Sequence, residues 1–156
     1  MPSQTEWDRR YLRLAREIAS WSRDPSTSVG AILVDAQHIA LATGHNGFTS
    51  GLRDTPERLN NRETRLKLTL HGEENCLINA GKAGHAVLGA TCYVWPLAPC
   101  VSCASKLVQA GVRTIVTVTA SPALTSRWGD DLALAQEVYN ETGVDLLIYE
   151  PEFLDD

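Results

Sequence analysis

Two short stretches of the chain hold the residue types that bind metals and move protons. His71 and Glu73 lie two positions apart in LHGEENCLINAG, residues 70–81, where an amphipathic helix is expected to begin. Cys100 and Cys103 form a C-x-x-C motif inside PLAPCVSC, at the expected start of another helix. Cysteines at this spacing usually bind a metal or carry redox chemistry. The sequence therefore offers two candidate chemical motifs, each ahead of its own helix.

Three of these side chains suit zinc. His71, Cys100 and Cys103 supply one imidazole and two sulfurs, which are ligands that zinc prefers. The two cysteines lie three residues apart on an opening helical turn, so their sulfurs face the same way and the helix N-terminus stabilises both thiolates. A structural zinc has four protein ligands, whereas a catalytic zinc keeps one position for water. Three ligands therefore predict a catalytic Zn²⁺ site.

Glu73 has a different predicted role. Two residues along a helix differ by about 200° of rotation, so Glu73 cannot easily bind the ion that His71 binds. At the first turn, however, its carboxylate can point at the open position of the metal. We expect His71 to hold the ion and Glu73 to move protons. Gly72 keeps this turn uncrowded and leaves its N–H free to face a ligand.

Helices and strands alternate around these motifs. Apolar residues at steps of three and four predict a helix over residues 5–22, and a short link joins the next two strands as an antiparallel hairpin. The other expected elements are strands 29–35 and 38–44, a polar helix over 57–68, helices 71–81, 101–111 and 130–143, and strands 90–96, 113–120 and 144–150. This order favours an α/β fold, a three-layer α/β/α sandwich with a five-stranded mixed sheet.

The bulk composition narrows the class of protein. The 156 residues show no repeat or composition break, so a single domain over residues 1–156 is expected. A net charge of −5 and a pI of about 5.3 disfavour a polynucleotide partner, though not a small phosphorylated ligand. No apolar run reaches the roughly 18 residues of a membrane span, and no signal-peptide core is present at the N-terminus. We therefore expect a cytoplasmic protein.

The order H-x-E and then P-C-x-x-C, with one expected strand between, is the signature of zinc-dependent nucleobase deaminases. The chain resembles this family, and deoxycytidylate deaminases in particular. The similarity runs over roughly residues 6–118 and includes WDRRYLRLAREIASWSRDPSTSVGAILVD, GHNGFTSG and CASKLVQAGV. The resemblance implies hydrolytic deamination of a cytosine nucleotide, with dCMP, giving dUMP and ammonia, as the first candidate. It also implies a homo-oligomer, either a dimer or a hexamer.

The resemblance also implies a role for individual residues. The zinc ligands would be His71, Cys100 and Cys103, and Glu73 would shuttle protons. Three residues would contact the nucleoside: Asn46 the sugar, Gly72 the pyrimidine O2 through its N–H, and Ala98 the amino group through its carbonyl. A phosphate would need nearby cations, and the candidates are Arg23, Arg53, Arg58, Arg62, Arg65 and Lys67.

Some features depart from the family and leave the substrate open. The family usually has H-A-E where this chain has Gly72, and G-Y-N-G where it has His45 in place of the tyrosine. SPALTSRWGDD stands where many deoxycytidylate deaminases carry a Tyr- and Asp-rich loop. Trp128 in this segment either replaces the lost aromatic side chain or packs against the sheet.

Other readings of the motifs remain open. The C-x-x-C motif alone fits a redox dithiol. A binding module with a structural zinc would need a fourth ligand, for which only His45, Cys76 and Cys92 are available. Among deaminases, the alternative substrates are cytidine, a modified pyrimidine, guanine and tRNA adenosine, the last of which needs a basic surface that an acidic chain disfavours.

Overall fold

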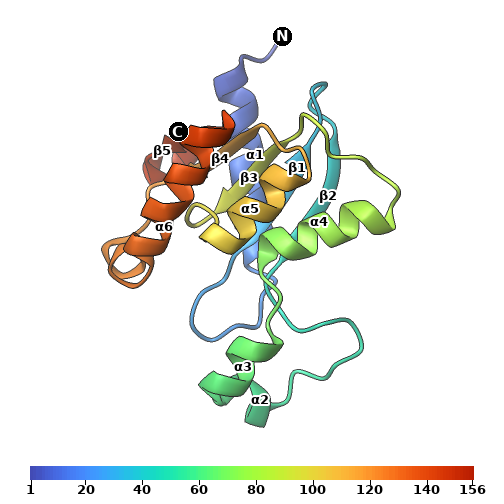
Figure 1. Ribbon diagram of the computed structural model, residues 1–156, viewed down its shortest axis with the longest axis vertical. Coiled ribbons are helices and arrows are strands. Elements are labelled where there is room, and N and C mark those ends of the chain that lie inside the picture. The colour runs from blue at the N-terminus through green and yellow to red at the C-terminus, as the bar shows by residue number, and fades with distance from the viewer.

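A five-stranded sheet lies between two layers of helices in the computed structural model, which describes residues 1–156 (Figure 1). The strand order is β2-β1-β3-β4-β5. Strand β1 runs antiparallel to β2 and β3, whereas β3, β4 and β5 run parallel. The bounds are β1 Gly30–Val34, β2 Ala40–His45, β3 Thr91–Trp95, β4 Thr114–Val118 and β5 Asp145–Tyr149. This confirms the predicted three-layer α/β/α sandwich and its mixed sheet.

The strands bury side chains on both faces because helices cover both. Along β1, Ile32 and Val34 pack on the side of helix α1, while Ala31 and Leu33 pack on the opposite side, as the alternation of a strand requires. Helix α1 (Gln4–Ala19) and the short 3₁₀ helix η1 (Pro151–Asp155) form one layer. The other layer consists of α4 (Gly72–Lys82), α5 (Val101–Gln109) and α6 (Pro122–Thr142). None of these helices combines the length and the apolar character that crossing a membrane requires.

Helix α4 lies close against strand β2. A Cβ atom at Gly44 would lie only 2.3 Å from the backbone nitrogen of Cys76, so only glycine permits this approach. On the same helix, the side-chain amides of Asn75 and Asn79 each donate a hydrogen bond of 2.8 Å to a backbone carbonyl of β2. Because His71 immediately precedes α4, these contacts fix the position of a predicted metal ligand.

The polar helix predicted over residues 57–68 is two helices, α2 (Pro56–Asn60) and α3 (Arg62–Leu68). Asn61 interrupts it with extended backbone angles, φ −91° and ψ 103°, and its side chain accepts a hydrogen bond of 3.1 Å from the N–H of Thr64. An asparagine that caps a new helix in this way favours a break over continuation. The pair α2–α3 projects from the body of the molecule (Figure 1).

The helix predicted at 130–143 begins eight positions earlier, at Pro122. Ser121 caps it by accepting a hydrogen bond of 3.3 Å from the N–H of Leu124, and proline suits the first helical position. The predicted start at residue 130 was therefore wrong. The correction matters for the site, since Arg127 and Trp128 lie on a helix.

Candidate active site

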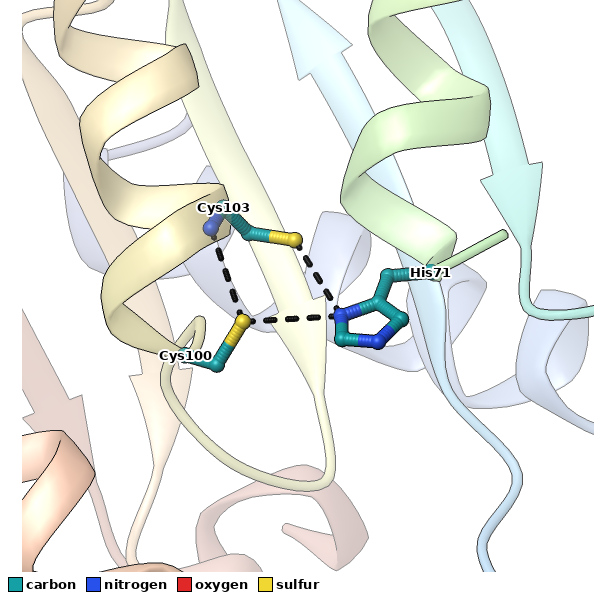
Figure 2. Close-up of side chains that lie close together, drawn as sticks. All are labelled: His71, Cys100 and Cys103. Atoms are coloured by element: carbon teal, nitrogen blue, oxygen red, sulfur yellow. Dashed lines mark hydrogen bonds between the residues drawn. The ribbon is translucent and has the colours of Figure 1, made fainter. Parts of the chain in front are cut away.

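The three predicted metal ligands meet where two helices begin. His71 caps α4, Cys100 caps α5, and Cys103 is the third residue of α5. Figure 2 shows their side chains pointing toward one another. The Nδ1 atom of His71 lies 3.4 Å from Sγ of Cys100 and 3.3 Å from Sγ of Cys103. The structure therefore brings together groups that are about thirty residues apart in sequence.

These distances fit a zinc ion. Tetrahedral zinc with ordinary bond lengths holds a nitrogen and a sulfur ligand about 3.5 Å apart. The ligand atoms of His71, Cys100 and Cys103 all lie within 4.8 Å of one another, and no fourth histidine, cysteine or carboxylate belongs to the cluster. The candidate fourth ligands Cys76 and Cys92 are buried among apolar side chains. A set of three ligands is typical of a catalytic zinc site, which keeps a position for water.

The two cysteines compete for one negative charge. The pKa of Cys100 is lowered to about 4, mainly by the hydrogen bond between Cys100 and Cys103 and next by the one between Cys100 and His71. The same contact with Cys100, together with burial, raises the pKa of Cys103 far above its usual range. A bound dication removes this competition, because a coordinating thiol is deprotonated outright. The electrostatics of the pair therefore also fit a metal site.

Glu73 is the only buried carboxylate near the cluster. It is the second residue of α4, and 4% of its surface is exposed. Burial is the main cause that raises its pKa to about 7, and the Cys100 thiolate adds to the effect. Glu73, His71 and Cys100 line the same cavity, so the carboxyl group and the metal cluster face a common space.

That cavity, of about 470 Å³, contains most of the predicted site residues. Asn46, Gly72 and Ala98 all belong to its wall. Arg23 does not. Its side chain is 76% exposed and lies 3.8 Å from the carboxylate of Asp54, in a neighbouring hollow. The structure therefore offers no contact between Arg23 and a ligand of the cavity.

Three other arginines reach the cavity. Arg62 and Arg65 come from α3 and were among the cation candidates, whereas Arg127 comes from α6 and was missed. Trp128, next to Arg127, also lines the cavity. The signal that could have revealed both residues is Ser121–Pro122, a cap followed by a favoured first helical residue.

Asn46 supports the cavity wall. Its side-chain oxygen accepts a hydrogen bond of 2.9 Å from the N–H of Val29, and its nitrogen donates one of 2.8 Å to the carbonyl of Thr27. The residue is 7% exposed. The amide thus fixes the segment before β1 and also faces the cavity.

Gly72 permits a close approach between α4 and the start of β1. A Cβ atom there would lie 3.1 Å from Cγ1 of Val29 and 3.2 Å from its carbonyl oxygen. The side chain that Gly72 lacks would therefore point at Val29. This contact gives a packing reason for glycine at a position where the family usually has alanine.

An α/β/α sandwich with one imidazole, two thiolates and a buried carboxylate at adjoining helix N-termini defines the zinc-dependent nucleobase deaminase class. Residues 5–119 match the family model described as "Cytidine and deoxycytidylate deaminase zinc-binding region", and the chain belongs to this family. Its members are zinc-dependent hydrolytic enzymes, and zinc is the metal that the cluster fits.

The chain is similar to several named proteins. It is 31% identical to an uncharacterized deaminase of Aliivibrio fischeri over 91% of this chain and 92% of that one. It is 33% identical to the deoxycytidylate deaminase of Mus musculus, over 71% of this chain and 64% of the mouse protein. It is 29% identical to the deoxycytidylate deaminase of Homo sapiens, over 89% of this chain and 77% of the human protein. The dCMP deaminase of cyanophage S-TIM5, solved with dCMP and dUMP, has the same fold, with a TM-score of 0.75 and 24% identity. The match covers 95% of this chain and 100% of the cyanophage chain.

Proposed function

We propose that this protein hydrolyses the amino group of a cytosine nucleotide, with dCMP as substrate and dUMP and ammonia as products. The observation that carries this proposal is that the buried carboxyl group of Glu73 lies beside three side chains that can bind one metal ion, and that both face one cavity. Relatives named deoxycytidylate deaminase support the choice of dCMP.

The proposed chemistry divides between the ion and the chain. Zinc held by His71, Cys100 and Cys103 would lower the pKa of a water molecule to roughly 7 and so would supply the nucleophile for C4 of the ring. Glu73 accepts one proton from the attacking water and delivers it to N3, and it then transfers the second proton, from the hydroxyl group added at C4, to the departing amine. The water oxygen becomes O4 of the uracil ring, and the amino group leaves as ammonia.

Backbone groups orient the ring in this proposal. The N–H of Gly72 donates to the pyrimidine O2, and the carbonyl of Ala98 accepts from the amino group. Both residues lie in the cavity wall with Glu73. Asn46 faces the sugar from a position that its hydrogen bonds to Val29 and Thr27 already fix, so its contact needs little reordering.

The arginines favour a nucleotide over a nucleoside. The side chain of Arg65 is 11% exposed, and its Nε atom is buried without a hydrogen-bond partner, 3.8 Å from the carboxylate of Asp24. Arg62 and Arg127 line the same cavity. Guanidinium groups with unused donors are suited to bind a phosphate. We therefore assign the 5′-phosphate to this group of arginines in place of Arg23.

We further propose that residues 1–156 form one domain, that the protein is cytoplasmic, and that it assembles into a homo-oligomer, a dimer or a hexamer. Four unpaired cysteines are consistent with a reducing compartment. The homo-oligomer follows from the resemblance to deoxycytidylate deaminases and not from a surface patch.

A substrate panel tests the proposal. Zinc-loaded protein is incubated with dCMP, CMP, deoxycytidine, cytidine, 5-methyl-dCMP and guanine, and ultraviolet absorbance and ammonia release are followed. We expect the highest kcat/KM for dCMP. The deaminase assignment fails if no compound reacts, and the pyrimidine assignment fails if guanine alone reacts. A nucleoside that reacts as well as its nucleotide would contradict the phosphate contact.

A further inference from the structure

Helix α6 holds the first turn of the helix that carries both cysteine ligands. Oδ2 of Asp131 accepts a hydrogen bond of 2.7 Å from the backbone N–H of Val101, the first residue of α5. The N–H groups of Cys103 and Ala104 have partners within the turn. That of Cys103 donates to Sγ of Cys100 at 3.5 Å, and that of Ala104 donates to the carbonyl of Cys100 at 2.8 Å. Asp131 is thus the hydrogen-bond partner of the N–H group of Val101, which directly follows Cys100 in the chain.

We propose that Asp131 is a positioning residue, which orients the Cys100 thiolate toward the zinc of the proposed active site. The N–H of Val101 belongs to the planar peptide unit that joins it to Cys100. A hydrogen bond that fixes this plane also fixes the ψ angle of Cys100, which is 164°. Because ψ sets how the plane is turned relative to Cα–Cβ, Asp131 fixes the direction in which the side chain of Cys100 leaves the turn.

The charge of the partner also argues for a role at the metal. A carboxylate forms a stronger bond to a helix N-terminal N–H than a neutral acceptor does. It also brings a negative charge close to the thiolates of Cys100 and Cys103, which is unfavourable unless a cation is bound among them. Partners of this kind orient metal ligands, and their loss typically lowers metal affinity by about 10- to 100-fold.

The same face of α6 forms part of the cavity. Arg127, Trp128 and Leu132 line it, and Asp131 lies four and three residues after the first two, so these side chains share one side of the helix. Asp130, by contrast, is exposed and makes no hydrogen bond through its side chain. One helix face therefore lines the cavity and holds the first turn of α5.

The test compares Asp131→Ala, Asp131→Asn and the control Asp130→Ala. Zinc affinity is measured by competition with a chelator, and the geometry of the site by the visible spectrum of cobalt-substituted protein. We expect Asp131→Ala to lose about 10- to 100-fold in zinc affinity and to change the cobalt spectrum. Asp131→Asn keeps an oxygen acceptor and should recover most of both properties, while Asp130→Ala should match the unmodified protein.

The proposal is overturned if Asp131→Ala keeps its zinc affinity and cobalt spectrum. It is equally overturned if both Asp131 variants only lower the thermal midpoint, because a purely structural contact would act in that way. In the substrate assay, kcat should fall for Asp131→Ala with little change in KM. The metal measurements need no substrate, so they remain valid if the protein fails to deaminate dCMP.

Discussion

Glu74 and Lys106 form an ion pair that joins the two helices carrying the metal ligands. One carboxylate oxygen of Glu74 accepts a hydrogen bond of 2.9 Å from the backbone N–H of His71, and the other pairs with the ammonium group of Lys106 on α5. The carboxylate thus links the start of α4, where His71 lies, to the helix that begins at Cys100.

Lys106→Gln should weaken this link without unfolding the protein. The two side chains are 48% and 21% exposed, so the pair contributes at most about 1 kcal/mol, and less at high salt. We expect a small, salt-dependent decrease in the unfolding free energy and faster loss of zinc to a chelator. Lys67→Gln removes an exposed pair with Glu63 on α3 and should leave zinc loss unchanged. Equal zinc loss in both variants would contradict the link.

Glu73→Gln separates a catalytic site from a structural one. The amide has nearly the shape of the carboxyl group but cannot shuttle a proton, so kcat should fall by about 10²- to 10⁴-fold. The zinc content, measured on the purified variant, should stay at one ion per chain because Glu73 is not among the three ligands. Turnover that survives the substitution would remove Glu73 from the mechanism.

Arg65→Gln tests the phosphate contact. Hydrogen bonds to a charged group contribute about 1.5–3 kcal/mol, so kcat/KM for dCMP should fall by roughly 10- to 150-fold. Deoxycytidine lacks the phosphate, and its kcat/KM should change little. Arg53 lies outside the cavity, and Arg53→Gln should leave both substrates unaffected. An equal loss for nucleotide and nucleoside would show that Arg65 acts through the fold, for example through its hydrogen bond to the carbonyl of Leu59.

The metal ligands could be predicted from sequence because local signals fix them. His71 and Cys100 each cap a helix, and one strand with its connections separates the two caps, so topology alone brings them to one edge of the sheet. The phosphate-binding residues could not be predicted in this way. Arg23 lies shortly before β1 yet faces another hollow, while Arg127 reaches the cavity only because α6 begins at Pro122.

The helices and strands, too, could be predicted only where a local sequence pattern marks them. The strands and the helices that pack on the sheet follow apolar patterns, and apart from the start of α6 they agree with the structure. The pair α2–α3 buries no residue completely, so no apolar stripe marks its ends. The side chain of Asn61 decides the break, and a single cap is a weaker signal than a repeated apolar pattern.

Alkaline pH should destabilise the fold through Cys76 and Cys92. Burial raises the pKa of Cys76 from its ordinary value of 9.0 to about 12 and raises that of Cys92 well above 9.0. The folded protein then keeps both protons after the unfolded chain has lost them. The contribution of the two thiols to the free energy of unfolding should hold steady below pH 9 and fall above it, by up to about 1.4 kcal/mol per pH unit for each thiol.

Urea denaturation between pH 8 and pH 10 measures this slope. Cys92→Ala loses packing at every pH, so the comparison uses the change with pH rather than the absolute stability. Its slope should be shallower than that of the unmodified protein, and Cys76→Ala should behave in the same way. Parallel curves for all three proteins would show that the thiols are not the groups that titrate.

Gly72→Ala should reveal that Gly72 and Val29 are coupled. The added Cβ atom would lie 3.1 Å from Cγ1 of Val29, closer than ordinary contact, so Val29 must move and the helical benefit of alanine is offset. In a Val29→Ala background that Cγ1 atom is gone while the contact of 3.2 Å with the backbone carbonyl oxygen of residue 29 remains, so the same change should destabilise the protein less than in the Val29 background. Urea denaturation of the unmodified protein, the two single variants and the double variant should give a coupling free energy of about 1 kcal/mol. Gly81 lies on the same helix, where an added Cβ meets nothing within 4 Å, so Gly81→Ala should stabilise both backgrounds equally. If the effects of Gly72→Ala and Val29→Ala simply add, the close approach does not explain why this position is glycine.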